Sequence, residues 1–340
     1  MPTKASSNCI LMFDIGGTYL RGAAKTVLPS GQYRTARRLT PNFLDRSDLS
    51  ADELIDAVLQ EMAFLARELL DDTAPTAVVV GWPGPVTPDG VSLRSPTILG
   101  PTLDRPVDIG RRAARLWPAA QVVVMNDLTC AGYAYVGEGF RDFCIFTVGS
   151  GIANKIFAHG QPMLGPNGRG GEVGHLAAWR GSRWLPGLVE ERIHLGDVAS
   201  GRGTLQVAQL LAQREPATFR RSVLGQLPVS FDNEALAEAF NLEDEFARRA
   251  IRLSAEALAH AIASVHVLVG CEQIFLTGGF AVALGEPYRR MLVDEARELT
   301  WDLGQDWNAI IKLGNDADGL RGGEVFARDV LLPKLSQSAA

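Results

Sequence analysis

Near its beginning the chain contains one stretch with an informative order of residue types: Met12-Phe13-Asp14-Ile15-Gly16-Gly17-Thr18-Tyr19-Leu20-Arg21. The apolar residues 9–13 predict a buried strand that ends on the Asp14 carboxylate. Two glycines and a hydroxyl follow before the chain becomes apolar again at residues 20–24, which indicates a tight β-hairpin with few side chains at its tip. The N–H groups at such a tip, together with Thr18, can hold phosphate oxygens, and Asp14 can hold Mg²⁺ through water. An ordinary hairpin turn is the alternative interpretation.

A second stretch repeats this order of residue types. Residues 143–148 predict a buried strand, and Gly149, Ser150 and Gly151 form a tip before the next strand at residues 152–157. A solitary Gly-Ser-Gly turn carries little information, but two such hairpins in one chain indicate an internal duplication. We therefore expect both halves of the chain to offer a phosphate-binding loop to one ligand between them.

The overall composition is typical of a soluble globular protein that is long enough for two domains. The chain has 340 residues, of which 46% are hydrophobic and 21% are charged. Its net charge of −6 provides no basic excess for nucleic-acid phosphates, so binding to nucleic acid is not expected. Residues 1–7 lack an apolar signal segment, and no apolar run reaches the roughly 18 residues that span a bilayer. We expect a cytoplasmic protein that does not bind membranes.

The four cysteines are scattered along the chain and form no C-x-x-C pair: Cys9, Cys130, Cys144 and Cys271. This spacing argues against a disulfide framework and against a zinc cluster built on cysteine, and it suits a reducing compartment.

Strands alternate with helices along the chain, which predicts an α/β architecture with functional sites at strand ends. Further strands are predicted at residues 34–40, 77–80, 122–125 and 273–276. Helices are predicted at residues 50–70, 106–117, 129–135, 203–214, 243–269 and 322–332, and residues 333–340 are expected to form a loose polar tail.

Polar side chains follow the predicted strand 122–125. A carboxylate at Asp127, just beyond a buried strand and next to Asn126, is well placed to act on a ligand. The alternative is that Asp127 only caps the following helix, which aspartate does well, and the two roles can coexist.

Two further groups of residues are candidates for ligand contacts. Glu172 and His175 follow a glycine-rich stretch, residues 164–171, and suit hydrogen bonding to a polyhydroxylated ligand, although a lone histidine is often structural. The glycine pair within residues 277–280 ends a predicted strand and would let a flat ring or a ribose lie against the backbone.

In this order the motifs resemble those of sugar kinases of the ROK family (repressors, open reading frames and kinases), and the resemblance spans nearly the whole chain. Residues 14–18 resemble the first phosphate motif, residues 149–152 the second, and residues 276–280 the adenosine motif. The implied ATP-binding residues are Asp14, Gly16, Gly17, Thr18, Gly149, Ser150, Gly151, Gly278, Gly279 and Phe280.

The acceptor side of the site also has counterparts in this family. Asn126 and Asp127 match its sugar-binding asparagine and catalytic aspartate, Glu172 and His175 match its sugar-binding pair, and residues 82–85 resemble its Gly-x-Pro-Gly loop. The implied substrate-binding residues are Gly84, Asn126, Asp127, Glu172, His175 and Asp197.

The resemblance also implies a fold and a mechanism. The fold is the two-domain, ribonuclease H-like one that actin, hexokinase and the heat-shock ATPases share, with ATP and substrate in a cleft between the domains. The expected N-terminal domain is 1–126, closed by the helix 322–332, and the C-terminal domain is 127–321, with dimerisation helices that imply a homodimer. Asp127 would act as general base while Mg²⁺ near Asp14 stabilises phosphate charge.

The chain departs from the family pattern in its zinc ligands. Members with a structural zinc use the histidine that corresponds to His175 and three cysteines in the following segment, where this chain has none. His194 lies near the position of the last cysteine, and two histidines do not complete a tetrahedral site, so no zinc is predicted.

Other departures affect the acceptor contacts. Gly196 occupies the position of a sugar-binding glutamate, which Asp197, Glu190 or Glu191 could replace. Lys155, with Asn154 before it, stands where the second phosphate loop is normally followed by glycines, and Thr97 stands where many sugar kinases have asparagine.

These departures make the chain similar to ROK-type kinases of actinobacterial natural-product (antibiotic) biosynthesis, which act on C7-cyclitols of the valienone or valiolone type or on amino sugars. A glucokinase or another hexose or amino sugar kinase is the alternative. A sugar-sensing repressor is disfavoured because Asp14 lies too close to Met1 for a helix-turn-helix domain. A dehydrogenase is disfavoured because no Gly-x-Gly-x-x-Gly follows the first strand.

Overall fold

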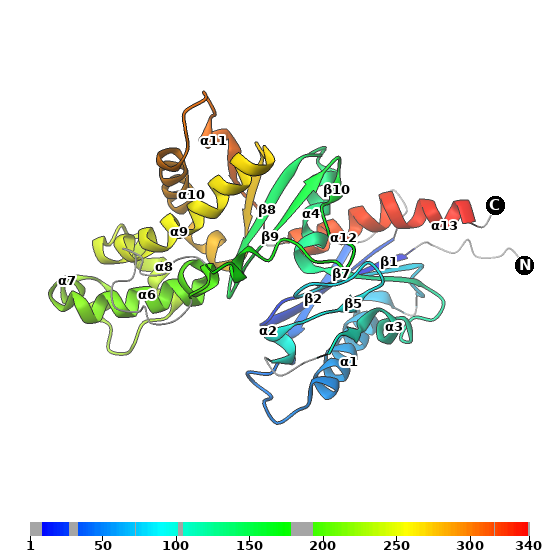
Figure 1. The fold of residues 1–340 in the computed structure, drawn as a ribbon. Helices are drawn as coiled ribbons and strands as arrows, with labels where there is room; N and C mark the ends of the chain where they lie inside the picture. Colours follow the sequence, from blue (N-terminus) through cyan, green and yellow to red (C-terminus); the bar gives the residue numbers. More distant parts are fainter. Residues whose placement is uncertain are drawn as a thin grey trace, which may run out of the picture. The chain divides into compact units, whose positions relative to one another are not determined.

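The computed structural model describes residues 9–26, 33–71, 73–100, 105–177, 193–315 and 317–338, and Figure 1 shows their elements. The chain forms two compact units, each discontinuous in sequence. Unit 1 comprises Met1–Arg141, Gly160–Gly170 and Ala317–Ala340, and unit 2 comprises Asp142–His159 and Gly171–Asp316. The expected domain boundary at residues 126/127 differs from this division, because the helix that begins at Asp127 packs within unit 1.

Unit 1 contains a five-stranded sheet in the order β3-β2-β1-β4-β7. Its strands are β1 (Cys9–Ile15), β2 (Tyr19–Thr26), β3 (Tyr33–Leu39), β4 (Ala77–Trp82) and β7 (Gln121–Asn126). The predicted opening hairpin is confirmed, because β1 and β2 pair antiparallel from Cys9↔Thr26 to Ile15↔Leu20. Strands β1, β4 and β7 are parallel to one another, so their carboxyl ends meet at one edge of the sheet.

The central strand of this sheet is buried on both faces, as its continuous apolar run predicts. Leu11, Phe13 and Ile15 belong to one buried cluster with the apolar face of α1 (Ala51–Leu70). Ile10 and Met12 alternate with them and belong to a second cluster, which includes residues of α4 (Asp127–Gly137) and α12 (Asp318–Phe326). The other elements of unit 1 are α2 (Pro96–Leu99), α3 (Ile109–Ala114), β5 (Val91–Ser92), β6 (Val107–Asp108), the π-helical η3 (Ala327–Leu331) and α13 (Leu332–Ser338).

The second five-stranded sheet has the order β10-β9-β8-β11-β12. Its strands are β8 (Phe143–Val148), β9 (Ile152–Ala158), β10 (Gln161–Pro162), β11 (Ile274–Thr277) and β12 (Ile311–Leu313). The second predicted hairpin is also confirmed, because β8 and β9 pair antiparallel up to Val148↔Ile152, while β8, β11 and β12 are parallel.

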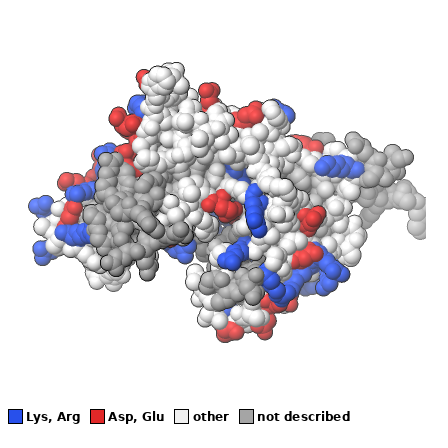
Figure 2. Space-filling model, viewed as in Figure 1, with Lys and Arg blue, Asp and Glu red and all other residues white. Residues whose placement is uncertain are grey.

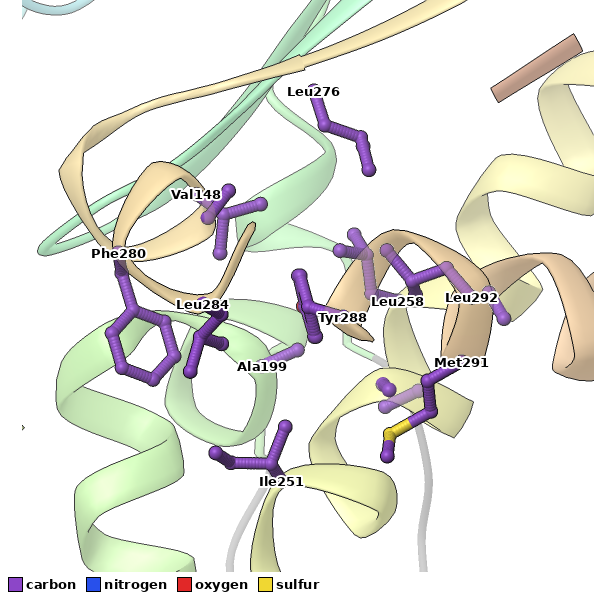
Figure 3. Packing of buried hydrophobic residues seen from close by; sticks show 14 of the residues in the cluster. Val148, Ala199, Ile251, Leu258, Leu276, Phe280, Leu284, Tyr288, Met291 and Leu292 are labelled. Carbon is purple, nitrogen blue, oxygen red and sulfur yellow. The ribbon is translucent and has the colours of Figure 1, made fainter. Parts of the chain in front are cut away.

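Helices supply most of the core of unit 2. They are α5 (Leu195–Ala199), α6 (Gly201–Arg214), α7 (Pro216–Arg221), α8 (Asn233–Asn241), α9 (Glu245–Val269), α10 (Gly279–Leu299) and α11 (Trp307–Ile310), with the short 3₁₀ turns η1 (Val173–His175) and η2 (Leu224–Gln226). Figure 3 shows how side chains of β8, β11, α9 and α10 meet in this buried cluster, among them Leu258, Leu276 and Leu292. The predicted end of α9 near Gly270 is confirmed, since this residue has φ 75° and caps the helix.

Helix α9 is long and apolar enough to count as a candidate membrane span by length and composition alone, a test that the core helix of a soluble protein also passes. Half of its apolar window is buried within the protein, and Ser254 of this helix donates a hydrogen bond to the Val198 carbonyl oxygen at 2.8 Å. Such contacts are those of a core helix. The face drawn in Figure 2 carries acidic and basic side chains intermixed.

Two predicted elements differ from the structure. The helix expected at residues 106–117 is shortened to α3, because residues 107 and 108 pair with β5 and Asp108 caps the helix by accepting from Arg111 N at 2.7 Å. The tail expected to be loose from residue 333 is helical to Ser338. The backbone stays helical without a break from α12 through the π-helical η3 into α13, and the buried Leu331 anchors the start of α13.

Candidate active site

In unit 1, candidate residues gather where parallel strands end. The register aligns Asp14 on β1 with Gly81 on β4, and Trp82 on β4 with Asn126 on β7. The loop after β4 then brings Gly84 to Asn126. Carboxyl ends of parallel strands are the usual position of ligand sites in α/β proteins.

The turn between β1 and β2 is held by two residues that the sequence did not single out. Thr40 Oγ1 donates to the Gly16 carbonyl oxygen at 2.8 Å, and Asn42 Nδ2 donates to that of Gly17 at 3.3 Å. Thr40 N also donates to the Thr18 carbonyl oxygen at 3.0 Å. Because C=O and N–H point in opposite directions in a trans peptide unit, these bonds turn the N–H groups of Gly17 and Thr18 to the other side of the turn. That is the arrangement an anion needs.

Asp14 lies in a confined but accessible environment. Its carboxylate is 17% exposed, and Arg21 Nη1 lies 3.4 Å from Oδ2. The first turn of α12 approaches so closely that a Cβ at Gly319 would be 2.5 Å from the Asp14 carboxyl carbon. Proteins commonly bind Mg²⁺ through one or two carboxylates plus substrate phosphates, so Asp14 fits a magnesium ion that accompanies a nucleotide.

Asn126 organises the start of α4. Its Oδ1 accepts from Thr129 N at 2.9 Å, and its Nδ2 donates to the Gly84 carbonyl oxygen at 2.9 Å and to Asp127 Oδ1 at 2.8 Å. Leu128 N donates to the same Asp127 oxygen at 2.8 Å. The helix cap is therefore Asn126, and the alternative in which Asp127 is the cap is wrong. Asp127 occupies the first helical position, where the helix dipole favours a negative charge.

A buried thiol lies near both carboxylates of this edge. Cys130 of α4 is buried, and its Sγ lies 3.3 Å from the Gly319 carbonyl oxygen. Burial raises the pKa of the Cys130 thiol, and the nearby charges of Asp14 and Asp127 raise it further. The edge of this sheet therefore holds two carboxylates beside a thiol that stays protonated at neutral pH.

In unit 2, the turn of residues 149–151 lies at the beginning of α6. Gly201 N donates to the Gly149 carbonyl oxygen at 2.8 Å, and Arg202 Nε donates to the Ser150 carbonyl oxygen at 2.8 Å. A helix N-terminus beside a glycine-rich turn is a combination that favours anions.

The other glycine motif of unit 2, at Gly278, lies against β8. Gly278 has φ 95°, and a Cβ there would be 2.8 Å from backbone atoms of Val148. This close approach, in a left-handed conformation, requires glycine. Phe280 is 7% exposed and belongs to the buried cluster with Val148 and Leu284, at whose edge Figure 3 shows it. Its ring packs into the core, so we expect its backbone rather than its ring to face a nucleotide.

The segment that carries Glu172 lies along β9. Asn154 N donates to the Gly171 carbonyl oxygen at 2.8 Å. A Cβ at Gly171, which has φ 75°, would lie 1.7 Å from the Asn154 oxygen, and one at Gly174 would lie 2.0 Å from the Ile152 oxygen. The two glycines therefore allow the close approach that fixes the position of Glu172.

Glu172 has a partner that lies on β9. Lys155 Nζ is 3.2 Å from Glu172 Oε1, and the lysine side chain is 1% exposed whereas the glutamate side chain is 31% exposed. Buried lysines are rare unless they are paired. The sequence showed Lys155 as a departure from the family pattern but gave no indication of this pair.

His175 lies beside His194, with ring centroids 6.2 Å apart. His194 precedes α5, and its backbone N donates to Asp197 Oδ2 at 2.9 Å. His194 is the N-cap of α5, and Asp197 completes the capping box as the third helical residue, a role that explains Asp197 without a ligand. A Cβ at Gly196 would lie 3.2 Å from the Gly174 oxygen, so the position of the family glutamate is packed against the Glu172 segment.

The remaining departures are placed as follows. Glu190 and Glu191, the alternatives to Asp197, lie outside the described residues. Thr97 is exposed, and its Cγ2 lies 2.5 Å from where a Cβ at Gly17 would be. Thr97 therefore covers one side of the first glycine turn. In the part of the chain that the structure describes, no group of three His, Cys, Asp or Glu side chains could hold a metal ion.

Each unit thus gathers its own set of candidate residues. Unit 1 brings together Asp14, Gly84, Asn126 and Asp127 at one sheet edge, and unit 2 brings the second glycine turn to α6 and Gly278, and Glu172 to β9. The supporting residues that sequence reasoning missed are Thr40, Asn42, Gly201, Arg202 and the Lys155–Glu172 pair.

The two sheets with their helices have the actin-like ATPase fold. The ROK family glucokinase from Streptomyces griseus, solved with glucose and AMPPNP, has a TM-score of 0.71 at 22% identity over 94% of this chain and 99% of that chain. A ROK family transcriptional regulator, a homolog of the E. coli MLC protein, has a TM-score of 0.76 at 18% identity over 97% of this chain and 81% of that chain.

Sequence comparison gives the family. The sequence model of the ROK family matches residues 11–300, and the chain belongs to this family. A C(7)-cyclitol 7-kinase from Streptomyces hygroscopicus subsp. jinggangensis (strain 5008) is 34% identical over 322 residues, which are 91% of this chain and 90% of the relative.

Proposed function

We propose that this chain transfers the γ-phosphoryl group of ATP to a hydroxyl group of a C7-cyclitol of the valienone or valiolone type. The observation that carries this proposal is the 34% identity to a C(7)-cyclitol 7-kinase over 91% of the chain. The acceptor residues support it, because amide, carboxylate and imidazole groups suit a ring with several hydroxyl groups. Placement in antibiotic biosynthesis, a cytoplasmic location and a homodimer remain predictions.

Asp127 is the proposed general base. It accepts the proton of the acceptor hydroxyl as that oxygen attacks the γ-phosphorus of ATP. Asn126 and Leu128 N both donate to Asp127 Oδ1, which leaves the orientation of the carboxylate fixed by two hydrogen bonds. Glu172, held by Lys155, and His175 orient the acceptor through its other hydroxyl groups.

The glycine turns are the proposed phosphate sites. The N–H groups of Gly17 and Thr18 in unit 1, and the turn of residues 149–151 in unit 2, donate to phosphate oxygens. Gly278 and Gly279 let the nucleoside approach the backbone. Asp14 would hold Mg²⁺ through water, and the ion when bound neutralises charge on the phosphate oxygens.

An acceptor screen tests this function. ADP release from ATP and Mg²⁺ is measured with glucose, mannose, N-acetylated and amino sugars, and C7-cyclitols such as valienone and valiolone. We expect kcat/KM to be highest for a C7-cyclitol, since hydrogen-bonding sites discriminate strongly between hydroxyl patterns. A preference for glucose would contradict the cyclitol as acceptor and would favour the second candidate, a hexose kinase.

A sugar-sensing regulator is the remaining candidate, and the fold alone does not separate it, since a ROK regulator shares this fold. ADP release with any acceptor at the rates typical of kinases, about 1–100 s⁻¹, excludes it. Binding of a sugar without any ADP release would favour it.

A further inference from the structure

Lys155 is a buried charged residue beside Glu172, a candidate acceptor-binding residue, and the family pattern did not predict it there. Its side chain is almost completely buried on β9, at 1% exposure. A Cβ at Gly171 would lie 2.9 Å from Lys155 Cδ, so the glycine-rich segment packs directly over the aliphatic part of this side chain. Moving an ammonium group out of water is costly unless an anion compensates for it. Glu172 supplies such an anion, at 3.2 Å.

The pair is asymmetric in a way that suits ligand binding. Lys155 Nζ contacts Oε1 of Glu172, while the glutamate side chain remains 31% exposed. An ionised carboxylate has about four acceptor positions on its two oxygens, so the salt bridge leaves Oε2 to accept hydrogen bonds from a ligand. The lysine therefore fixes the direction of the carboxylate through Oε1 and does not occupy Oε2.

We propose that Lys155 is a positioning residue that holds Glu172 for an uncharged polyhydroxylated acceptor and disfavours acceptors that carry an ammonium group. This inference rests on the proposed kinase function and deepens it by separating neutral cyclitols from amino sugars. The Lys155–Glu172 pair has no net charge, so it offers hydrogen-bond acceptors without a net negative field. A carboxylate without the lysine would instead attract a protonated amine.

The test compares acceptor kinetics of four proteins with the wild type: Lys155→Met, Lys155→Arg, Glu172→Gln and the double variant Lys155→Met/Glu172→Gln. Methionine keeps the aliphatic length and removes the charge, and Glu172 can remain hydrated because it is partly exposed. Lys312→Met is the matched control. This lysine also lies on a strand of the second sheet, but its Nζ donates to the neutral Gln273 Oε1 at 2.6 Å.

We expect Lys155→Met to raise KM for the acceptor about tenfold or more, as for loss of a charge-assisted contact, while KM for ATP stays within about twofold. Arginine at this position should restore part of the acceptor affinity. In the Glu172→Gln background the Lys155→Met change should add little, because the lysine acts through the glutamate. The ratio of kcat/KM for glucosamine to that for the neutral acceptor should rise in Lys155→Met.

The outcomes separate the two proposals. A wild-type protein that neither phosphorylates nor binds any acceptor in the screen overturns the kinase function, and this is seen before any variant is compared. An active wild type with an unchanged acceptor KM in Lys155→Met, or with effects that add fully in the double variant, overturns the role of Lys155 alone. An equal rise of the acceptor KM in Lys312→Met would show a general effect on folding, and it would also overturn the proposed role of Lys155.

Discussion

At the scale of single residues, Asp127 carries the most specific prediction. Replacing it by asparagine keeps an oxygen that can accept from Asn126 Nδ2 and Leu128 N, so the start of α4 should remain intact. The proton acceptor is lost, and kcat should fall by about 10²- to 10⁴-fold. The measurement is coupled ADP release, with acceptor binding followed by calorimetry.

The matched control for this variant is Asp108→Asn, which alters another carboxylate at a helix start of unit 1. It should leave kcat unchanged. Substantial kcat in Asp127→Asn would assign the proton transfer to another group. Loss of acceptor binding together with activity would indicate that Asp127 binds the acceptor or supports the fold instead of taking the proton.

At the scale of elements, the contact between α4 and α12 depends on glycine. A Cβ at Gly322 would lie 1.8 Å from the Cys130 carbonyl oxygen, whereas one at Gly323 would meet first the Met12 Cγ at 3.2 Å. A flexible methionine can move and a helix backbone cannot. Gly322→Ala should therefore destabilise the protein by about 1–3 kcal/mol, as overpacking does.

Gly323→Ala is the control one residue away on the same helix. Both variants replace glycine by a better helix former, a change worth about 1 kcal/mol in favour of the helix. The free energy of unfolding is measured by denaturant titration of both. Equal values for the two variants would show that α4 and α12 are not held as closely as the structure indicates.

The elements also show how far the sequence alone leads. Both hairpins, the buried strands and α9 were predictable because buried strands and long amphipathic helices have clear apolar periods. The short α3 and the helical tail were not, because pairing of residues 107–108 with β5 and burial of Leu331 are tertiary effects. The sequence also could not show that Asn126 rather than Asp127 caps α4, because either residue can cap a helix and local preference does not distinguish them.

The candidate site was likewise predictable only in part. Motif residues such as Asp14 and Glu172 could be named from spacing, but their partners could not. Thr40 comes to the first turn only because β3 pairs with β2, and Lys155 meets Glu172 only because the segment after Gly171 folds back along β9. Such contacts join positions that no local pattern relates.

At the scale of the whole molecule, the two sheets repeat one topology. In each, an antiparallel hairpin, β1–β2 or β8–β9, is followed by two strands parallel to its first strand. Each repeat places a glycine turn at the tip of its hairpin. The internal duplication expected from the two glycine motifs is therefore visible in the strand order of each unit.

Metal content is a property of the whole molecule and gives the last prediction. The chain has only four cysteines, and none lies between His175 and His194, where zinc-binding members of the family would supply them. All four thiols are buried, and burial is the largest cause that raises the pKa of each. Zinc binds the thiolate, so thiols that stay protonated at neutral pH are poor ligands.

Purified protein should therefore contain no stoichiometric zinc by elemental analysis, and treatment with EDTA followed by dialysis should leave its thermal unfolding unchanged. Activity should still be lost in EDTA and return with Mg²⁺ alone, because the proposed ion accompanies ATP at Asp14 and is not part of the fold. One tightly held zinc per chain, lost in His175→Ala and His194→Ala, would instead show that the two histidines recruit ligands from elsewhere in the chain. That result would assign His175 to structure and remove it from the acceptor site.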